Sequence, residues 1–313
     1  MSATTLAGRY LYYPGCSLKG TGRAYETSLL AVFRALGVEL LELDDWNCCG
    51  ATAYMSVDEV KAFALSGRNL ALAERQGLPD EARGEQVDLI APCSACYLVL
   101  NKTQAYMRYY PQIGQRVSQA LQTAGLRYKG SVRIRHPLDV LVNDVGLDEI
   151  ALKVKTPLKG LKVAPYYGCQ IVRPFATFDD RHNPVTMDRL LGAVGAEVVD
   201  YPLKTSCCGG SLTGNLPKVG VTLVHALLDE ARKRGADVIA TVCPLCQFNL
   251  DAFQERAGGR RTNDHHAPTA SQQLPVVYFT QLLGLALGIP ARELGLQANI
   301  VPAEPALAKR GVL

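Results

Sequence analysis

Long apolar segments and nucleotide-binding motifs are both missing from this sequence. The first ten residues contain no hydrophobic stretch of signal-peptide length, and the apolar run 282–289 is broken by two glycines and too short to cross a bilayer. No dinucleotide fingerprint is present, and the glycine-rich run 209–214 lacks the Lys-Ser/Thr of a phosphate-binding loop. We therefore predict a cytoplasmic protein without a membrane span.

The charge distribution excludes a further class of partner. The net charge is +4 at neutral pH, and the basic residues are scattered rather than gathered in a stripe. This distribution does not support binding to nucleic acid. With 313 residues, of which 48% are hydrophobic, the chain is long enough to fill two cores, so we predict two domains.

The ten cysteines form two groups of five with the same internal order. Each group has a single Cys, then Cys-Cys-Gly, then Cys-x-x-Cys, and no cysteine is left over. The first quintet is Cys16, Cys48, Cys49, Cys93 and Cys96, and the second quintet is Cys169, Cys207, Cys208, Cys243 and Cys246. Because structural disulfides are rare in a reducing compartment, the pattern predicts two metal sites.

The repetition extends beyond the cysteines. Segments 12–16, 35–41 and 88–91 match segments 166–169, 193–199 and 237–240. A period of about 150 residues is far longer than a solenoid repeat, so we predict duplication of a whole domain. The expected fold is α/β, with residues 1–153 and 154–313 each forming a small parallel sheet flanked by helices, related by a pseudo-two-fold axis. The boundary is expected in the polar stretch 147–160.

Short apolar runs alternate with helical patterns, which implies parallel sheets. Strands are predicted at 10–13, 39–43, 89–91, 162–166, 197–201 and 238–242. Helices are predicted at 57–76 behind a Ser56–Glu59 capping box, from Asn183-Pro184 to Gly192, and from Pro217 to Gly235. Residues 274–289 are predicted to form a strand and a helix, 257–273 an exposed loop, and the last dozen residues a loose tail.

Five thiols per half exceed the four ligands of a structural zinc ion or a cubane iron–sulfur cluster. Adjacent cysteines on a strand point to opposite faces, so both reach one centre only if the backbone turns at Gly50 and at Gly209-Gly210. A helix beginning soon afterwards would direct N–H groups toward the sulfurs. The set favours a multi-iron cluster, with a zinc site, a purely structural cluster and a thioredoxin-like pair as alternatives.

The histidines are weaker candidates. His265 and His266 are expected to be solvated in a polar loop, and His182 and His225 to be ordinary surface or helix residues. His136, between Arg135 and Pro137, is a candidate proton donor, but a structural role is the preferred interpretation.

With these motifs, the sequence resembles the B subunit of heterodisulfide reductase, in the cysteine-rich CCG family. The resemblance runs almost end to end and includes the Tyr-Gly-Cys169 segment, the Cys243-Pro244-x-Cys246 segment, the surroundings of His136 and the stretch 278–286. It implies that each quintet holds a non-cubane [4Fe-4S] cluster. It also implies that the two clusters face a shared cleft where a disulfide is split, and that the partners are a flavin-carrying subunit and a small ferredoxin-like subunit.

Three functions remain open at this point. Cleaving a disulfide takes two electrons, whereas an iron–sulfur cluster usually passes one, so two matched clusters suit a catalytic thiol/disulfide subunit. A lipoyl group on a carrier protein is one candidate for the substrate thiol of such a subunit. The direction of electron flow is left open, because the same chemistry runs either way. The first alternative is a non-catalytic electron conduit in a complex that oxidises lactate, glycolate, glycerol-3-phosphate or succinate. The second is a zinc-stabilised scaffold.

Overall fold

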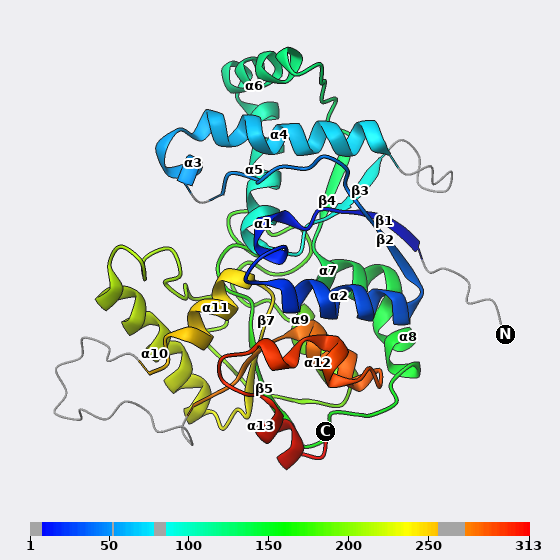
Figure 1. The fold of residues 1–313 in the computed structure, drawn as a ribbon, viewed down its shortest axis with the longest axis vertical. Coiled ribbons are helices and arrows are strands. Elements are labelled where there is room, and N and C mark those ends of the chain that lie inside the picture. The colour runs from blue at the N-terminus through cyan, green and yellow to red at the C-terminus, as the bar shows by residue number, and fades with distance from the viewer. Residues whose placement is uncertain (1–7, 52, 78–85, 256–272) are drawn as a thin grey trace.

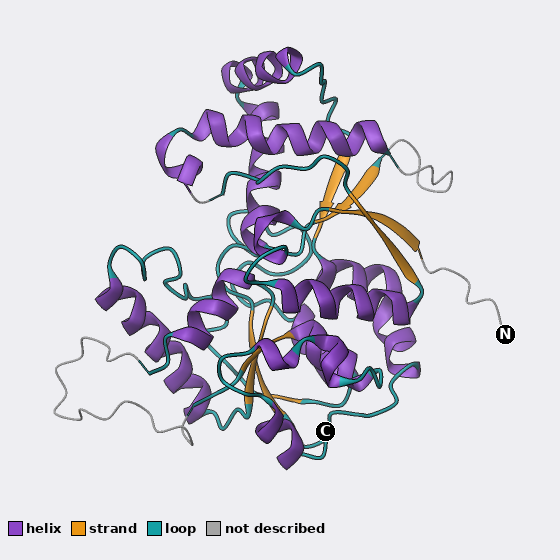
Figure 2. Ribbon diagram, in the orientation of Figure 1, coloured by secondary structure: helices purple, strands orange, loops and turns teal. Residues whose placement is uncertain are grey.

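The computed structural model of the protein describes residues 8–51, 53–77, 86–255 and 273–313. Strands form two separate four-stranded sheets, one in each half of the chain, and helices surround both (Figure 1 and Figure 2). The strand order is β2-β1-β3-β4 in the first sheet and β6-β5-β7-β8 in the second. All strand pairs in the described ranges are parallel, so the two halves repeat one topology.

The elements of the first half alternate as expected for a parallel sheet. They are β1 (Gly8–Tyr12), α1 (Gly15–Leu18), α2 (Arg23–Leu36), β2 (Val38–Glu42), α3 (Ala53–Val57), α4 (Glu59–Gln76), β3 (Val87–Ile90), α5 (Ser94–Tyr109), α6 (Pro111–Thr123), β4 (Val132–Arg135), α7 (Pro137–Asp139), the π-helix η1 (Val140–Gly146) and α8 (Leu147–Leu152).

The second half follows the same course with shorter helices. It contains β5 (Lys162–Tyr166), α9 (Thr186–Ala193), β6 (Glu197–Val198), α10 (Pro217–Lys233), β7 (Val238–Thr241), α11 (Pro244–Ala252), β8 (Val276–Tyr278), α12 (Phe279–Ala286), the 3₁₀ turns η3 (Ala291–Leu294) and η4 (Leu296–Ala298), and α13 (Glu304–Lys309).

One hydrophobic core is continuous through both halves. Its members include Tyr10 and Leu29 from the first half and Val238 and Leu283 from the second. Helix α2 packs against α12, so an early helix and a late helix lie side by side at the centre of the molecule (Figure 1). We call this contact between the halves the seam. A smaller cluster, which includes Val224 and Leu250, fills the space between the second sheet and α10 and α11.

The strand predictions are confirmed. All six predicted strands are present within two or three residues of the expected bounds, and β8 and α12 occupy 276–286 as the pattern 274–289 predicts. The helix 217–235 is confirmed as α10, which ends at Lys233 before Gly235 with φ +74°. Strand β4 was not predicted, because its Val-Arg-Ile-Arg sequence is short and half polar.

Both predicted helix caps are wrong. Helix α4 begins at Glu59, and the carboxylate of Asp58, not the hydroxyl of Ser56, accepts a hydrogen bond from the Lys61 N–H. Ser56 lies in the preceding short helix α3. Helix α9 begins at Thr186 rather than after Asn183, because the Asp179 carboxylate reaches across the loop and accepts the N–H groups of residues 185 and 186.

The expected loose tail is also wrong. Residues 304–309 form α13, Leu307 is fully buried, and Arg310 forms a two-contact ion pair with Asp237. The stretch 147–160, in which the boundary is expected, begins with α8, and the division between residues 153 and 154 stays a prediction. The predicted loop 257–273 and His265 and His266 lie outside the described residues, apart from residue 273. No helix in the described ranges has the length and apolar composition needed to cross a membrane.

Candidate metal centre

The first cysteine quintet assembles at the carboxyl end of the first sheet. Cys16 lies in α1 directly after β1, Cys48 and Cys49 follow β2, and Cys93 and Cys96 follow β3 at the start of α5. The Cys16 and Cys48 sulfurs are 4.0 Å apart, and those of Cys49 and Cys96 are 3.3 Å apart. The thiols of Cys48 and Cys49, and those of Cys93 and Cys96, also lie close enough to shift each other's pKa. The five sulfurs therefore form one connected group.

The second quintet assembles at the equivalent place. Cys169 follows β5, and Cys243 and Cys246 follow β7 at the start of α11. The thiol pairs Cys169 and Cys207, Cys208 and Cys246, and Cys243 and Cys246 lie close enough to shift each other's pKa. Both quintets therefore gather at the carboxyl ends of their sheets, whereas the role of the ten cysteines as ligands stays a prediction.

The Cys-Cys-Gly turns have the predicted backbone. Gly50 has φ +80° and Gly209 has φ +79°, the left-handed region in which glycine is the least strained residue. The Gly50 N–H is 3.5 Å from the Cys48 sulfur, and the Gly209 and Gly210 N–H groups are each 3.3 Å from the sulfurs of Cys207 and Cys208. The donors come from the turn itself, and they stabilise thiolate charge.

Two further glycines bring the backbone against a sulfur. A Cβ on Gly15 would lie 2.9 Å from the Cys96 sulfur, and one on Gly168 would lie 3.2 Å from the Cys246 sulfur. Both have positive φ, +67° and +71°. The residue before the first cysteine of each quintet is therefore restricted to glycine by backbone angle and by space.

The thiols are not electrostatically equivalent. Hydrogen bonds from Cys48 and Cys96 hold the pKa of Cys49 well below its usual value, and a hydrogen bond from Cys169 lowers the pKa of Cys207 to about 6. Hydrogen bonds from Cys246 and Cys93 likewise lower the pKa of Cys243. Each quintet therefore contains at least one thiol that readily becomes the thiolate required of a metal ligand.

The two quintets meet at the seam. The thiols of Cys93 and Cys243 lie close enough to shift each other's pKa, and they are 4% and 2% exposed. These residues occupy equivalent positions in the two halves. Equivalent residues of the two halves therefore lie close together at the seam, and the pseudo-two-fold relation between the halves stays a prediction.

Three more contacts hold the seam closed around this sulfur pair. Gly22 lies against Pro244, so that a Cβ on Gly22 would be 2.9 Å from the proline Cβ. The rings of Tyr25 and Tyr278 stack with centroids 4.5 Å apart and planes 5° from parallel. The buried hydroxyls of Ser28 and Thr280 are 2.6 Å apart.

His136 is a structural residue at the same seam. Its Nδ1 accepts a hydrogen bond from the Leu138 N–H at 3.2 Å, and its Nε2 lies 3.1 Å from the carbonyl of Pro92. Complete burial lowers its pKa to about 3, so the ring is neutral. The interpretation of His136 as structural agrees with both observations. His182 is exposed and His225 is half-buried on α10, as expected.

Buried hydroxyls without a partner gather around the cysteines. In the described chain five such hydroxyls are found, on Tyr25, Ser66, Ser94, Thr103 and Thr241. Ser94 lies inside the first Cys-x-x-Cys, Thr241 lies two residues before the second, and Tyr25 lies at the seam. Buried polar groups are normally satisfied, so these three fit a site for a further polar group. Together with the thiols and N–H donors, they fit a thiolate-bound metal cluster.

The described side chains do not form a ready site for a single metal ion. No three or more of their His, Cys, Asp and Glu groups converge as one ion requires. Cys16, Cys48 and Cys207 are exposed, so solvent reaches one side of each quintet. The shared cleft implied by the family resemblance stays a prediction.

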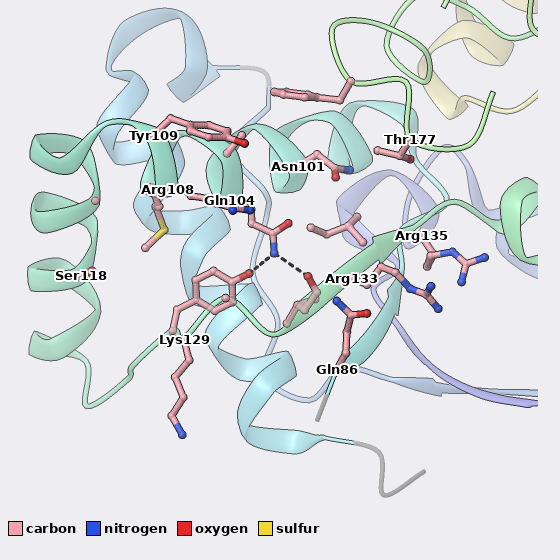
Figure 3. Close-up of a pocket in the computed structure, with 18 of the residues that line it drawn as sticks. Gln86, Asn101, Gln104, Arg108, Tyr109, Ser118, Lys129, Arg133, Arg135 and Thr177 are labelled. Atoms are coloured by element: carbon pink, nitrogen blue, oxygen red, sulfur yellow. Dashed lines mark hydrogen bonds between the residues drawn. The ribbon is translucent and has the colours of Figure 1, made fainter. Parts of the chain in front are cut away.

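A large pocket lies away from the cysteines. It has a volume of about 1380 Å³ and is bordered by α5, α6 and β4, with Thr177 from the second half at its rim (Figure 3). Inside it, the Gln104 amide donates to the Tyr128 hydroxyl at 2.6 Å and to the Val132 carbonyl at 2.7 Å (Figure 3). None of its lining residues is a cysteine, so it is separate from the candidate metal centre.

Tyr25 and Tyr278 are the site residues that the sequence did not single out. Tyr278 belongs to the segment quoted for the family resemblance, but nothing there indicates a partner in the other half. Tyr25 lies on the apolar face of a helix, where a tyrosine is normally a core residue.

Comparisons with known proteins agree with the duplicated fold. The family model described as CCG, cysteine-rich domain, matches residues 10–101 and 163–251. An 8-methylmenaquinol:fumarate reductase membrane anchor subunit from Wolinella succinogenes is 33% identical over 94% of this chain and 97% of that protein. A protein from Archaeoglobus profundus, named as similar to the B subunit of heterodisulfide reductase, is 32% identical over 90% of this chain and 91% of that protein.

A further sequence relative and a solved structure also match this chain. The B subunit of a ferredoxin/F(420)H(2)-dependent CoB-CoM heterodisulfide reductase from Methanosarcina acetivorans is 30% identical over 95% of both chains. The crystal structure of a hypothetical protein from Helicobacter pylori superposes with a TM-score of 0.67 at 14% identity, over 95% of this chain and 52% of that chain. This chain therefore spans about half the length of that solved chain, and the likeness shows the fold alone.

Proposed function

This chain belongs to the CCG cysteine-rich domain family, which includes the B subunits of heterodisulfide reductases, and we propose that it is the iron–sulfur subunit of an oxidoreductase complex. Each quintet holds one cluster, of the non-cubane [4Fe-4S] type. When bound, such clusters accept and donate single electrons. The relatives are named as subunits of larger reductases, which supports partner subunits for this chain. The partners that we propose are a flavin-carrying subunit and a ferredoxin-like subunit.

The reaction that we propose is reductive cleavage, or oxidative formation, of a substrate disulfide. In the reductive direction the S–S bond breaks, two electrons arrive from the partner subunits, two protons come from solvent, and two thiols leave. The observation that carries the proposal is the contact between Cys93 and Cys243. It supports the proposal because clusters held by the two quintets would then lie at one seam, as a two-electron bond cleavage by one-electron centres requires.

Backbone N–H groups and exposed thiols have different roles in the proposed cluster sites. N–H groups of Gly50, Gly209 and Gly210 stabilise the thiolates of the Cys-Cys pairs. The low pKa of Cys207 keeps one exposed thiol ionised near neutral pH. Exposed sulfurs on both quintets, Cys16 and Cys48 on one and Cys207 on the other, leave each centre open to a substrate from solvent.

A second function is favoured by one specific comparison. The relative from Wolinella succinogenes is named as the membrane anchor subunit of a fumarate reductase that uses a quinol, and the match covers 97% of its length. The alternative for this chain is accordingly an electron conduit between a partner dehydrogenase or reductase and a quinone. The same two quintets in contact at the seam serve that role as well.

Metal analysis tests the part that both functions share. Protein purified without oxygen is expected to contain about eight iron atoms and a similar amount of sulfide, four of each per quintet. Cys208→Ser is expected to halve the iron content, because it removes a ligand of the second quintet only. Stoichiometric zinc without sulfide contradicts both functions, and an unchanged iron content in Cys208→Ser contradicts the ligand assignment.

A disulfide titration separates the two functions. Lipoamide, in its oxidised and reduced forms, is added to the isolated protein, and the cluster electron paramagnetic resonance spectrum is followed. A new signal that depends on the added thiol supports the thiol/disulfide reaction. An unchanged spectrum, combined with oxidation of the reduced clusters by a soluble quinone, supports the conduit.

A further inference from the structure

One buried tyrosine in each half lies three residues before the first cysteine of its quintet. Tyr13 has this position relative to Cys16, and Tyr166 has it relative to Cys169. Both side chains are 0% exposed, and both hydroxyls donate a hydrogen bond to a backbone carbonyl. The two acceptors are equivalent as well, because each is the carbonyl of the residue directly before a Cys-Cys pair.

The two hydrogen bonds are nearly equal in length. The Tyr13 hydroxyl is 2.8 Å from the Asn47 carbonyl oxygen, and the Tyr166 hydroxyl is 2.7 Å from the Ser206 carbonyl oxygen. A carbonyl and the N–H of the following residue belong to one planar peptide group. Each hydroxyl therefore fixes the orientation of the peptide that leads into the adjacent cysteines.

The backbone of each tyrosine is held by the strand that leads into the Cys-x-x-Cys. The Tyr13 N–H donates to the Ile90 carbonyl at 2.8 Å, and Tyr166 is paired with Thr241 in the parallel ladder of β5 and β7. Strands β3 and β7 end shortly before the Cys-x-x-Cys of their quintets. Each tyrosine thus connects all three cysteine-bearing segments of its own quintet.

The ring of each tyrosine lies against the glycine that precedes the first cysteine. A Cβ on Gly15 would be 3.4 Å from the Tyr13 ring and 2.9 Å from the Cys96 sulfur. In the second half, a Cβ on Gly168 would be 3.9 Å from the Tyr166 ring. Each tyrosine is therefore packed beside its own group of sulfurs, although its hydroxyl is bound to the backbone.

We propose that Tyr13 and Tyr166 are positioning residues for the two clusters. The hydroxyl of each holds the Cys-Cys segment at the spacing from the other two segments at which five sulfurs bind one cluster. Each hydroxyl acts through the peptide that it binds and is not a ligand. The inference rests on the proposed function, because it requires a cluster in each quintet.

The two halves differ in how strongly they depend on the tyrosine. The Asn47 carbonyl also accepts the side-chain amide of Asn69 at 2.9 Å, so it keeps a donor when the Tyr13 hydroxyl is removed. Among the described residues, no donor other than Tyr166 is found for the Ser206 carbonyl. A carbonyl that loses its partner is costlier than one that keeps a second, so the second quintet depends more on its tyrosine.

The test measures iron loss from one site at a time. Cys49→Ser leaves only the second quintet complete, and Cys208→Ser leaves only the first. In Cys49→Ser protein loaded without oxygen, Tyr166→Phe is expected to speed iron release to a chelator about tenfold, and Tyr13→Phe to leave the rate unchanged. In Cys208→Ser protein, Tyr13→Phe is expected to speed release about threefold, and Tyr166→Phe to leave the rate unchanged.

Tyr201→Phe is the matched control. Tyr201 is 1% exposed, its hydroxyl donates to the Leu227 carbonyl at 2.9 Å, and it shares a hydrophobic cluster with Tyr166. The variant loses the same kind of hydrogen bond in the same core, at a carbonyl that does not lead into a cysteine. The melting temperature of metal-free protein gives the stability that each variant loses. Tyr201→Phe is expected to lose stability but to keep the wild-type rate of iron release.

The outcomes distinguish this inference from the proposed function. A wild-type protein that binds no iron contradicts the proposed function and this inference with it. Iron-loaded protein in which Tyr13→Phe and Tyr166→Phe both keep the wild-type release rates overturns this inference alone. Equal acceleration at both sites by either variant also overturns it, because the effect would then come from a general loss of stability. Release from Tyr201→Phe as fast as from Tyr166→Phe overturns it for the same reason.

Discussion

Gly22 in the first half lies directly against Pro244 in the second. A Cβ at position 22 would be 2.9 Å from the proline Cβ and 3.0 Å from the Ser17 carbonyl oxygen. Neither a proline ring nor a backbone carbonyl can move away from an added Cβ without a shift of the backbone. Pro244 sits between Cys243 and Cys246, so the spacing of the two halves and the position of the second Cys-x-x-Cys depend on the same contact.

Gly22→Ala is therefore expected to destabilise the protein. Overpacking of this kind typically costs about 1–3 kcal/mol, which denaturant unfolding measures directly. Gly192→Ala is the matched control, because Gly192 lies in α9 and a Cβ there would have no atom within 4 Å. That helical substitution is expected to stabilise by about 0.5–1 kcal/mol. Equal effects at both positions would show that the seam does not resist the added methyl.

Gly15→Ala is expected to reduce metal loading at the first quintet. The added Cβ would approach the Cys96 sulfur to 2.9 Å at a φ of +67°. Gly160→Ala separates the two causes, since Gly160 also has a positive φ, +76°, but no atom within 4 Å of its Cβ position. Iron analysis is expected to show a loss in Gly15→Ala and normal content in Gly160→Ala. A loss in both would trace the effect to backbone strain alone.

The Ser28 and Thr280 hydroxyls are expected to stabilise the fold jointly, through the hydrogen bond between them. Ser28→Ala leaves the Thr280 hydroxyl buried without its partner, at a cost of about 1–3 kcal/mol. Thr280→Val leaves the Ser28 hydroxyl the carbonyls of Ala24 and Tyr25, so its cost is expected to be smaller. The double variant is expected to lose an amount of unfolding free energy close to that lost by Ser28→Ala, and less than the sum of the two single losses. Strict additivity in a double-mutant cycle would rule out coupling across the seam.

His136 is expected to make stability fall in acid. The unfolded chain binds a proton near the ordinary pKa of 6.5, whereas burial lowers the folded pKa to about 3. The unfolded state therefore binds more protons in this window, and stability is lost as the pH falls from about 6.5 toward about 3. The loss at pH 5 is expected to be about 2 kcal/mol relative to pH 7.5.

Comparison with His136→Gln isolates this contribution, because glutamine does not titrate. The free energy of unfolding of metal-free wild type minus that of the variant is expected to fall between pH 7.5 and pH 5. Metal-free protein is used because acid also releases metal from thiolates. A difference that is constant across this range would contradict a neutral His136 in the folded state.

Patterns of burial and spacing predicted the parts of the fold that are set locally. Strands such as β5 and β7 are apolar runs that must be buried on both faces of a parallel sheet, so the sequence alone locates them. The cysteines follow those strands, and their convergence comes from the rule that parallel strands present their carboxyl ends at one edge. Gly50 and Gly209 were identified because adjacent cysteines need a turn there.

Features that depend on distant partners were not predictable. The N-terminus of α9 is fixed by Asp179, which lies seven residues before Thr186, and no helix signal marks such a reach. Helix α13 is held by burial of Leu307 and by the ion pair between Arg310 and Asp237, and the sequence of the tail indicates neither contact. The seam residue Tyr25 is recognisable only once Tyr278 stacks on it.

The packing of α2 on α12 has a consequence for assembly in the cell. Ser28 and Thr280 are 252 positions apart, so a ribosome must release most of the chain before the two hydroxyls can meet. The first quintet is translated long before the lobe that shields Cys93 exists. If the cysteines bind metal only after the seam has closed, metal insertion must accordingly follow translation. In a chain that ends before α12, the thiols at the seam would be exposed to oxidation.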